Sequence, residues 1–434
     1  MAIVNAKLLS QVATSLDIGC DVLHFGNRKL EKQLSAENMS GDTVYVTEAD
    51  GGKIIDGSLN TEAAGEGDKA VARSETPITV APIVGTYQLS QEQLDLMIKE
   101  SEFADKMVAR MVDKVNGKAA DCIASGCRAV VVEKDSSTSA IKTDDLVAAF
   151  FDSLASIEAS KIKGKIYGLG NSLTLNAMAR GLAQGTAGIG IQSHGGELWQ
   201  RNLANFGGLD WSKSGILGTV TQSASVNGID QVTGYSKVVD PCGSGFYVID
   251  KVTIHLSSSV TLAAGDAVTP ITVAGWCMTD ALGNSTGIPL SLEGTVDAAV
   301  TSSQSVVVKL SRPIHAAALD PLRNGYVPGF VNEGGEPSGL TLVAVSVLSA
   351  DKTYYKPVLM WNENDFYVAV KGLSPMKASD SATIPGGFTD KGILPLRGTA
   401  WTEHATSQLN VRFDCMYGFM MKRGIAGVKV YIEA

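Results

Sequence analysis

The chain has 434 residues, of which 44% are hydrophobic and 19% charged, and its formal net charge is −9 at pH 7. The hydrophobic content supports a sizeable core and excludes global disorder. The length predicts two or three domains, or one domain with insertions. We find no cluster of Lys and Arg of the kind that binding to nucleic-acid phosphates requires. If the chain meets DNA at all, we therefore expect it to be part of a container wall that repels the duplex.

The six cysteines are spread along the chain without a C-x-x-C pair. This spacing predicts reduced, mostly buried thiols made in a reducing compartment. The N-terminal residues lack a basic stretch followed by an apolar run, so we expect no signal peptide. No segment approaches the roughly 20 apolar residues of a membrane span, and we therefore expect no membrane partner.

The N-terminal segment Val4–Leu34 reads as short helical pieces that Gly19 and Gly26 interrupt, as in an arm. Asp17 and Asp21 stand four residues apart and can share one helical face. That face is either simply solvated or a docking patch for a partner.

Two runs with strand character, Asp42–Thr47 and Ile78–Leu89, flank an acidic stretch rich in Gly and Ala, Glu48–Ala72. The pattern predicts a long two-stranded loop. Ordering such a loop costs about 1–2 kcal/mol per residue of backbone entropy, so we expect a neighbouring subunit to supply the missing burial. Lys53 and Lys69 are interpreted as ordinary surface lysines. The contact candidates in this segment are Glu48, Asp50, Lys53, Asp56, Glu62, Glu66 and Lys69.

Ser90 and Gln93 form a capping box that predicts a helix from Gln91 to Ile123. Apolar residues then recur at three- and four-residue steps, and an unbroken helix would span about 50 Å. We interpret its Met-rich side as packing. The elements expected next are a helix capped by Thr143 or Asp144 and ending at Ser160, a strand over Lys165–Leu169, and a helix from Ser172 to Arg180.

From Thr221 to Val345 the pattern changes to short alternating runs separated by Gly, Asp and Asn. This pattern predicts a small β-barrel or sandwich inserted into an α/β frame. The remainder of the chain returns to longer apolar runs. The expected strands of the insertion include Tyr247–Leu256, Val260–Leu262, Ile271–Trp276 and Val306–Leu310.

The chain shows no assembled catalytic motif. The five histidines are far apart, and only His194, near Glu197, has neighbours typical of catalysis. The Gly188-Ile189-Gly190 run lacks a preceding strand and carries Ser193 at the third glycine position of a dinucleotide motif. We therefore predict no catalytic, cofactor-binding or metal-binding residues, and a structural or binding role.

Four stretches stand in a fixed order: Asp42–Val46, Asn205–Ser214, Gly265-Asp266-Ala267-Val268 with Ile271–Gly275, and Leu409–Val430 with the Tyr417-Gly418 pair. In that order they resemble the major coat proteins of the Salmonella short-tailed phage P-twenty-two type. These have the HK-ninety-seven fold with an inserted β-barrel domain. The sequence departs from the family at Gly215, where proline is usual, and in a shorter loop around Val238–Gly245.

The resemblance implies an α+β capsid fold with a long spine helix, an extended two-stranded loop and the inserted barrel. It implies a shell of hexamers and pentamers that encloses double-stranded DNA without sequence-specific binding, in a virion assembled in the bacterial cytoplasm. A scaffolding protein and a portal are the further partners, with Asp17 and Asp21 as candidates for the scaffold contact. Val238 and Asp240 belong to the loop that bridges capsomers in the family. The implied regions are the arm 1–36, the loop 37–89, a peripheral domain 90–142, an axial domain 143–220, the insertion 221–345 and the return segments 346–434.

Three other readings remain open. An encapsulin-type nanocompartment shell shares the fold but normally lacks the inserted barrel. A β-rich adhesin or binding module is opposed by the missing signal peptide and the long capped helix. An α/β enzyme is opposed by the missing site.

Overall fold

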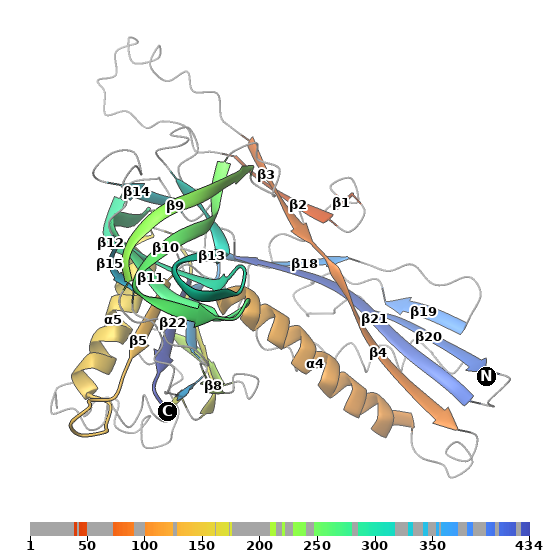
Figure 1. Cartoon of the computed structure of the whole chain (residues 1–434). Helices are drawn as coiled ribbons and strands as arrows, with labels where there is room; N and C mark the ends of the chain where they lie inside the picture. The colour runs from red at the N-terminus through yellow and green to blue at the C-terminus, as the bar shows by residue number, and fades with distance from the viewer. Residues whose placement is uncertain are drawn as a thin grey trace, which may run out of the picture.

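The computed structural model places most of the described chain in β-strands, which form separate sheets around two helices (Figure 1). The described residues are 39–40, 43–49, 73–90, 100–124, 128–160, 162–172, 174–175, 209–213, 219–221, 229–239, 247–279, 285–316, 329–332, 342–345, 353–355, 357–371, 380–384, 396–403, 408–421 and 427–434.

The longer helix, α4 (Glu100–Ala124), packs its apolar side on a five-stranded antiparallel sheet, the β21 sheet. Met107, Met111 and Val115 are buried there, as the three- and four-residue spacing predicts. A Cβ at Gly85 would lie 2.6 Å from Sδ of Met111, so this glycine lets the helix approach the sheet closely. The strands are β4 (Ala81–Ser90), β18 (Phe366–Lys371), β19 (Asp380–Ile384), β20 (Leu396–Glu403) and β21 (Gln408–Met421).

The second helix, α5 (Thr143–Ala159), covers a mixed five-stranded sheet, the β22 sheet. Its side chains Leu146, Phe150 and Ile157 enter a buried cluster with residues of that sheet. The strands are β5 (Arg128–Val132), β6 (Ile166–Gly170), β7 (Asp210–Lys213), β17 (Val358–Asn362) and β22 (Gly427–Ile432). The strand expected at Lys165–Leu169 is confirmed as β6.

A separate three-stranded sheet stands off the β21 sheet (Figure 1). It consists of β1 (Met39–Ser40), β2 (Thr43–Ala49) and β3 (Arg73–Thr79), with β2 and β3 antiparallel. At its base, Ile78 and Val80 are buried with Tyr367, Ala369 and Met416 of the β21 sheet. We call the β21 and β22 sheets with α4 and α5 the body. The hairpin is therefore fixed to the body at one end.

The strand character expected between Thr221 and Val345 is confirmed, except that the expected strands Tyr247–Leu256 and Val260–Leu262 are one continuous strand, and the strands form one seven-stranded sheet. Strands β11, β12, β13 and β14 pair in a closed ring, and β15 lies beside β9. Alternate residues such as Val252, Ile254 and Leu256 fill its own buried core, as the period of two predicts. The strands are β9 (Ile229–Val239), β10 (Tyr247–Leu262), β11 (Ala267–Thr279), β12 (Ser285–Val296), β13 (Val300–Ala316), β14 (Gly329–Asn332) and β15 (Leu342–Val345).

The chain enters and leaves this sheet through two short strands that pair with each other. Strand β8 (Thr219–Thr221) is antiparallel to β16 (Thr353–Tyr355). Tyr354 of β16 is fully buried, and its hydroxyl donates to Glu133 at 2.7 Å. Both connections are thereby anchored on the body at the same place.

Ser90 is the last residue of β4 and pairs with Gln408, and residues 91–99, where the expected helix would begin, lie outside the described residues. The two other expected helix caps differ from the structure. The N-cap of α5 is Lys142, without a side-chain cap, so Thr143 and Asp144 lie inside the helix. In the next helix Asn171 caps in place of Ser172, because its Oδ1 accepts from the Thr174 amide at 2.7 Å.

The expected second strand of the extended loop, Ile78–Leu89, is two strands. The hairpin partner β3 ends at Thr79, and β4 turns into the β21 sheet, where it pairs with β21 along its whole length. The burial of Ile78, Val80 and Ile83 explains the change of partner, since these side chains fill the core at the turn.

Gly418 in β21 lets the base of the β2–β3 hairpin lie close to the β21 sheet. A Cβ there would lie 2.6 Å from the backbone oxygen of Thr79 and 2.8 Å from Cγ2 of Ile78. Because a backbone oxygen cannot move aside cheaply, Gly418→Ala should lower the free energy of unfolding by about 1–3 kcal/mol in urea denaturation. The control is Gly234→Ala in β9, where the nearest atom would be 3.8 Å away. Equal losses in the two variants would contradict this account.

Candidate functional site

No group of three or more His, Cys, Asp or Glu side chains among the described residues is placed to hold a metal ion. His255 lies in β10 opposite Ser305, and His315 lies in β13 opposite Gly329. His194 lies outside the described residues. Among the polar features of the described residues are two buried ion networks and one basic groove.

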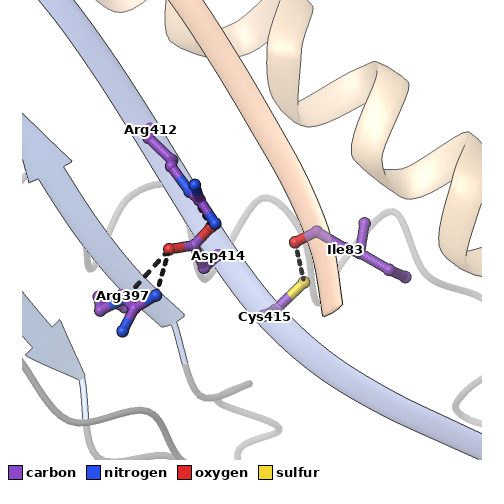
Figure 2. Close-up of polar contacts among 5 residues, drawn as sticks. All are labelled: Ile83, Arg397, Arg412, Asp414 and Cys415. Atoms are coloured by element: carbon purple, nitrogen blue, oxygen red, sulfur yellow. Dashed lines mark hydrogen bonds and ion pairs between the residues drawn. The ribbon is translucent and has the colours of Figure 1, made fainter. Parts of the chain in front are cut away.

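The first network holds β20 against β21 on the side of the sheet away from α4 (Figure 2). Asp414, only 1% exposed, accepts from Nε and Nη2 of Arg397 at 3.0 and 2.7 Å through one carboxylate oxygen. Its other oxygen accepts from Nε of Arg412 at 2.5 Å. A buried carboxylate needs such charge-assisted partners, because desolvation otherwise makes its ionised form costly.

The next residue of β21, Cys415, points toward β4 (Figure 2). Its thiol lies 3.6 Å from the carbonyl oxygen of Ile83, to which it donates. Burial raises the pKa of Cys415 to about 12, so the group behaves as a small apolar side chain. This agrees with the expected reduced, buried thiol.

The second network joins the closed sheet to the body. Lys429 of β22 is buried and donates to the carbonyl oxygen of Ala124, the last residue of α4, at 2.6 Å. Its ammonium also forms an ion pair with Glu293 of β12. The Tyr431 hydroxyl donates to the same Glu293 carboxylate at 3.1 Å. One cation therefore ties the C-terminal end of α4, where positive charge is favoured, to two sheets.

A groove of about 630 Å³ runs between α4 and β4, and we call it the α4–β4 groove. Its strand side is formed by consecutive residues, Pro82–Thr86, and its floor includes Met107 and Met111. Four cations of α4 line it at four-residue steps, and we call them the cation row: Lys106, Arg110, Lys114 and Lys118.

The cation row corrects the expectation that the chain has no cluster of Lys and Arg. Lys106, Arg110 and Lys114 are exposed, and no ion pair to them is found within the described residues. The exposed acids Asp113 and Asp121 of α4 do not line the groove. The members of the cation row are not contiguous in sequence. They lie on one side of α4 because residues four apart in a helix are neighbours on its surface.

Two of the predicted contact residues lie within the described residues. Glu48 lies in β2, opposite Ser74, and Val238 lies in β9, opposite Val248. The other candidates lie outside the described residues, namely Asp17, Asp21, Asp50, Lys53, Asp56, Glu62, Glu66, Lys69 and Asp240.

Among the described helices, none combines the length and apolar character that crossing a lipid bilayer requires. No protein-family model matches the chain, and the search of curated proteins found no match.

Three solved structures are similar to this chain over most of its length. The capsid structure of the cyanophage P-SCSP1u is 9% identical, with 91% of this chain and 84% of that chain covered and a TM-score of 0.45. The mature capsid of bacteriophage PhiM1 is 6% identical, with 90% and 82% covered and a TM-score of 0.43. The capsid of Ralstonia phage GP4 is 7% identical, with 91% and 84% covered and a TM-score of 0.40. These identities and TM-scores do not assign the chain to a family.

Removing one partner of the Asp414 network should destabilise the β21 sheet. Arg397→Met deletes a bidentate contact to a buried carboxylate, and we expect a loss of about 2–3 kcal/mol in the free energy of unfolding. The matched control is Lys251→Met, which removes an ion pair to Asp297 whose side chains are 34% and 31% exposed. That change should have little effect, and a similar loss from both substitutions would show that burial is not the cause.

Buried acidic groups also predict alkaline destabilisation. Burial raises the pKa of Cys415 from 9.0 to about 12 and that of Tyr431 from 10.0 to about 12. The unfolded chain therefore releases these protons first, so stability is retained below about pH 9 and falls as the pH rises from about 9 to 12. Urea midpoints measured across this range should decline less steeply for Cys415→Ala combined with Tyr431→Phe. An unchanged slope would rule out these two groups as the cause.

Proposed function

We propose that the chain is the major capsid protein of a tailed double-stranded-DNA bacteriophage, a structural subunit without catalytic activity. The observation that carries the proposal is the β2–β3 hairpin, which forms its own sheet and joins the body at its base through Ile78 and Val80. The segment between its strands, 50–72, adds an acidic stretch rich in Gly and Ala. A hairpin of this kind suits a shell, in which neighbouring copies supply burial that the single subunit does not.

The finer assignment follows the HK-ninety-seven-type architecture of the P-twenty-two type. Helix α4 would be the spine helix of a peripheral domain, residues 90–142, and α5 would belong to an axial domain, residues 143–220. The closed sheet would be the inserted domain, residues 221–345. The paired connections β8 and β16 support this proposal, because an inserted domain must leave and re-enter its host at one place.

The proposed assembly contains hexamers and pentamers of this chain, formed in the bacterial cytoplasm around a scaffolding protein and a portal. We propose Asp17 and Asp21 as the scaffold contact, and residues of the hairpin and of the β9 end as contacts between copies. Lys53 and Lys69 remain ordinary surface lysines in this proposal. The proposed contacts between copies are Glu48, Asp50, Asp56, Glu62, Glu66, Val238 and Asp240.

Electron microscopy of the purified chain, with and without its scaffold, tests the proposal directly. Closed shells with hexamers and pentamers are expected, because many modest contacts close cooperatively. A monomer that stays dispersed at all concentrations, or that turns over a substrate, would refute the proposal.

The scaffold contact is tested in the same assay. Asp17→Lys with Asp21→Lys should impair scaffold-directed assembly through charge repulsion. The control is Asp152→Lys with Glu158→Lys, which reverses two exposed acids of α5. Normal shells from the first pair would exclude this role for the arm.

A further inference from the structure

The strand side of the α4–β4 groove is a sheet edge. Strand β4 pairs with β21 along Ala81–Ser90, and its other edge pairs with no strand among the described residues. Consecutive residues of β4 line the groove, including Val84, which is 42% exposed. The groove therefore opens along the edge of the sheet and not beneath it. A free edge of this kind is a template for an added strand.

The cation row runs beside this edge. Lys106 to Lys118 spans about 18 Å of helix at 1.5 Å per residue. On the same Cα-to-Cα basis, Pro82 to Thr86 spans about 13 Å of strand, so the cation row extends beyond these five residues. Successive cations are about 6 Å apart along the helix, while alternate side chains of an extended chain are about 6.6–6.8 Å apart. An extended peptide on this edge would thus present every second side chain to one cation.

We propose that the α4–β4 groove binds an extended acidic segment of a second copy of this chain, which adds to β4 as a strand and sets its carboxylates against the cation row. The inference rests on the proposed function, because it requires that copies associate. It adds to the proposed function the binding site on one copy, the binding mode, and the segment of the second copy that occupies the site.

The complementary segment follows from the sequence by elimination. Five pairs of acids stand two residues apart. Glu133 and Asp135 bond to Tyr354 and Lys142, Glu363 bonds to Tyr167, and the pair at 100 and 102 lies in α4 itself. Glu48 lies in β2, where it is opposite Ser74 of β3 in the hairpin. The remaining pair is Glu66 and Asp68.

Glu62 stands on the same side of an extended chain as Glu66 and Asp68, because all three positions are even-numbered and strand side chains alternate. The opposite side carries Ala63, Gly65 and Gly67. We therefore assign Glu62–Asp68 of a second copy to the groove.

A nucleic-acid strand is the rival occupant, since a row of cations also attracts phosphate. The exposed Val84 and the methionine floor favour a peptide, because a phosphate backbone gains nothing from apolar surface. The unpaired strand edge also offers backbone hydrogen bonds that only a peptide matches in spacing.

Charge exchange in the full-length protein tests the proposal. The groove variant is Lys106→Glu with Arg110→Glu, and the segment variant is Glu66→Lys with Asp68→Lys. Each should raise the protein concentration needed for shell assembly by about tenfold, measured by light scattering and electron microscopy. The quadruple variant should return toward the wild-type concentration, because the charges are again opposite. The control, Lys163→Glu with Lys309→Glu, reverses two exposed lysines outside the groove.

The outcomes separate the two proposals. A wild-type chain that never assembles refutes the proposed function and this inference with it. Wild-type shells with a groove variant that assembles equally well refute the inference alone, and so does a quadruple variant that is folded but not restored. Unchanged assembly together with weaker binding of a DNA duplex by the groove variant would assign the groove to nucleic acid instead.

A covalent test does not depend on altered charge. Subunits carrying Thr86→Cys are mixed with subunits carrying Gly67→Cys, assembled and oxidised. A disulfide-linked dimer of the two variants is expected, since position 86 lies on the groove and position 67 in the assigned segment. Its absence from assembled shells would overturn the assignment.

Discussion

The pairing of β21 with strands distant in sequence is the constraint on which the rest of the subunit depends. One edge of β21 pairs with β4, more than 300 residues earlier in the chain, and the other edge pairs with β20 and β18. The core beneath α4 is made of side chains from these same strands. The groove, the hairpin base and the Asp414 network all take their geometry from this sheet.

From this dependence we expect an order of events in folding. Pairs such as β9 with β10 are local and can form early, whereas β4 with β21 and β5 with β22 bring the first third of the chain to its end. The closed sheet has its own buried core, so it can collapse before the body is complete. In the folded chain the connections β8 and β16 pair with each other, and the buried Lys429–Glu293 ion pair joins the closed sheet to the β22 sheet.

Local patterns predicted local structure well. The three- and four-residue spacing of Met107, Met111 and Val115 predicts the buried side of α4, and alternation predicts the strands of the closed sheet. The strand break at Thr79 was not predicted, because continuous β character does not reveal a change of pairing partner. Arg397 and Asp414 meet only through pairing of β20 with β21, and no local signal marks them.

The cation row shows a different kind of failure. Its members at 106, 110, 114 and 118 are visible in the sequence at the helical step, yet a search for contiguous basic runs passes over them. Within the proposed shell, such an exposed row gives contacts that are individually weak and screened by salt. Weak contacts let a misplaced copy leave before the shell closes, and multivalency then makes the closed shell stable. A net negative chain with one local basic groove therefore fits copies that repel at long range and attract only in the correct register.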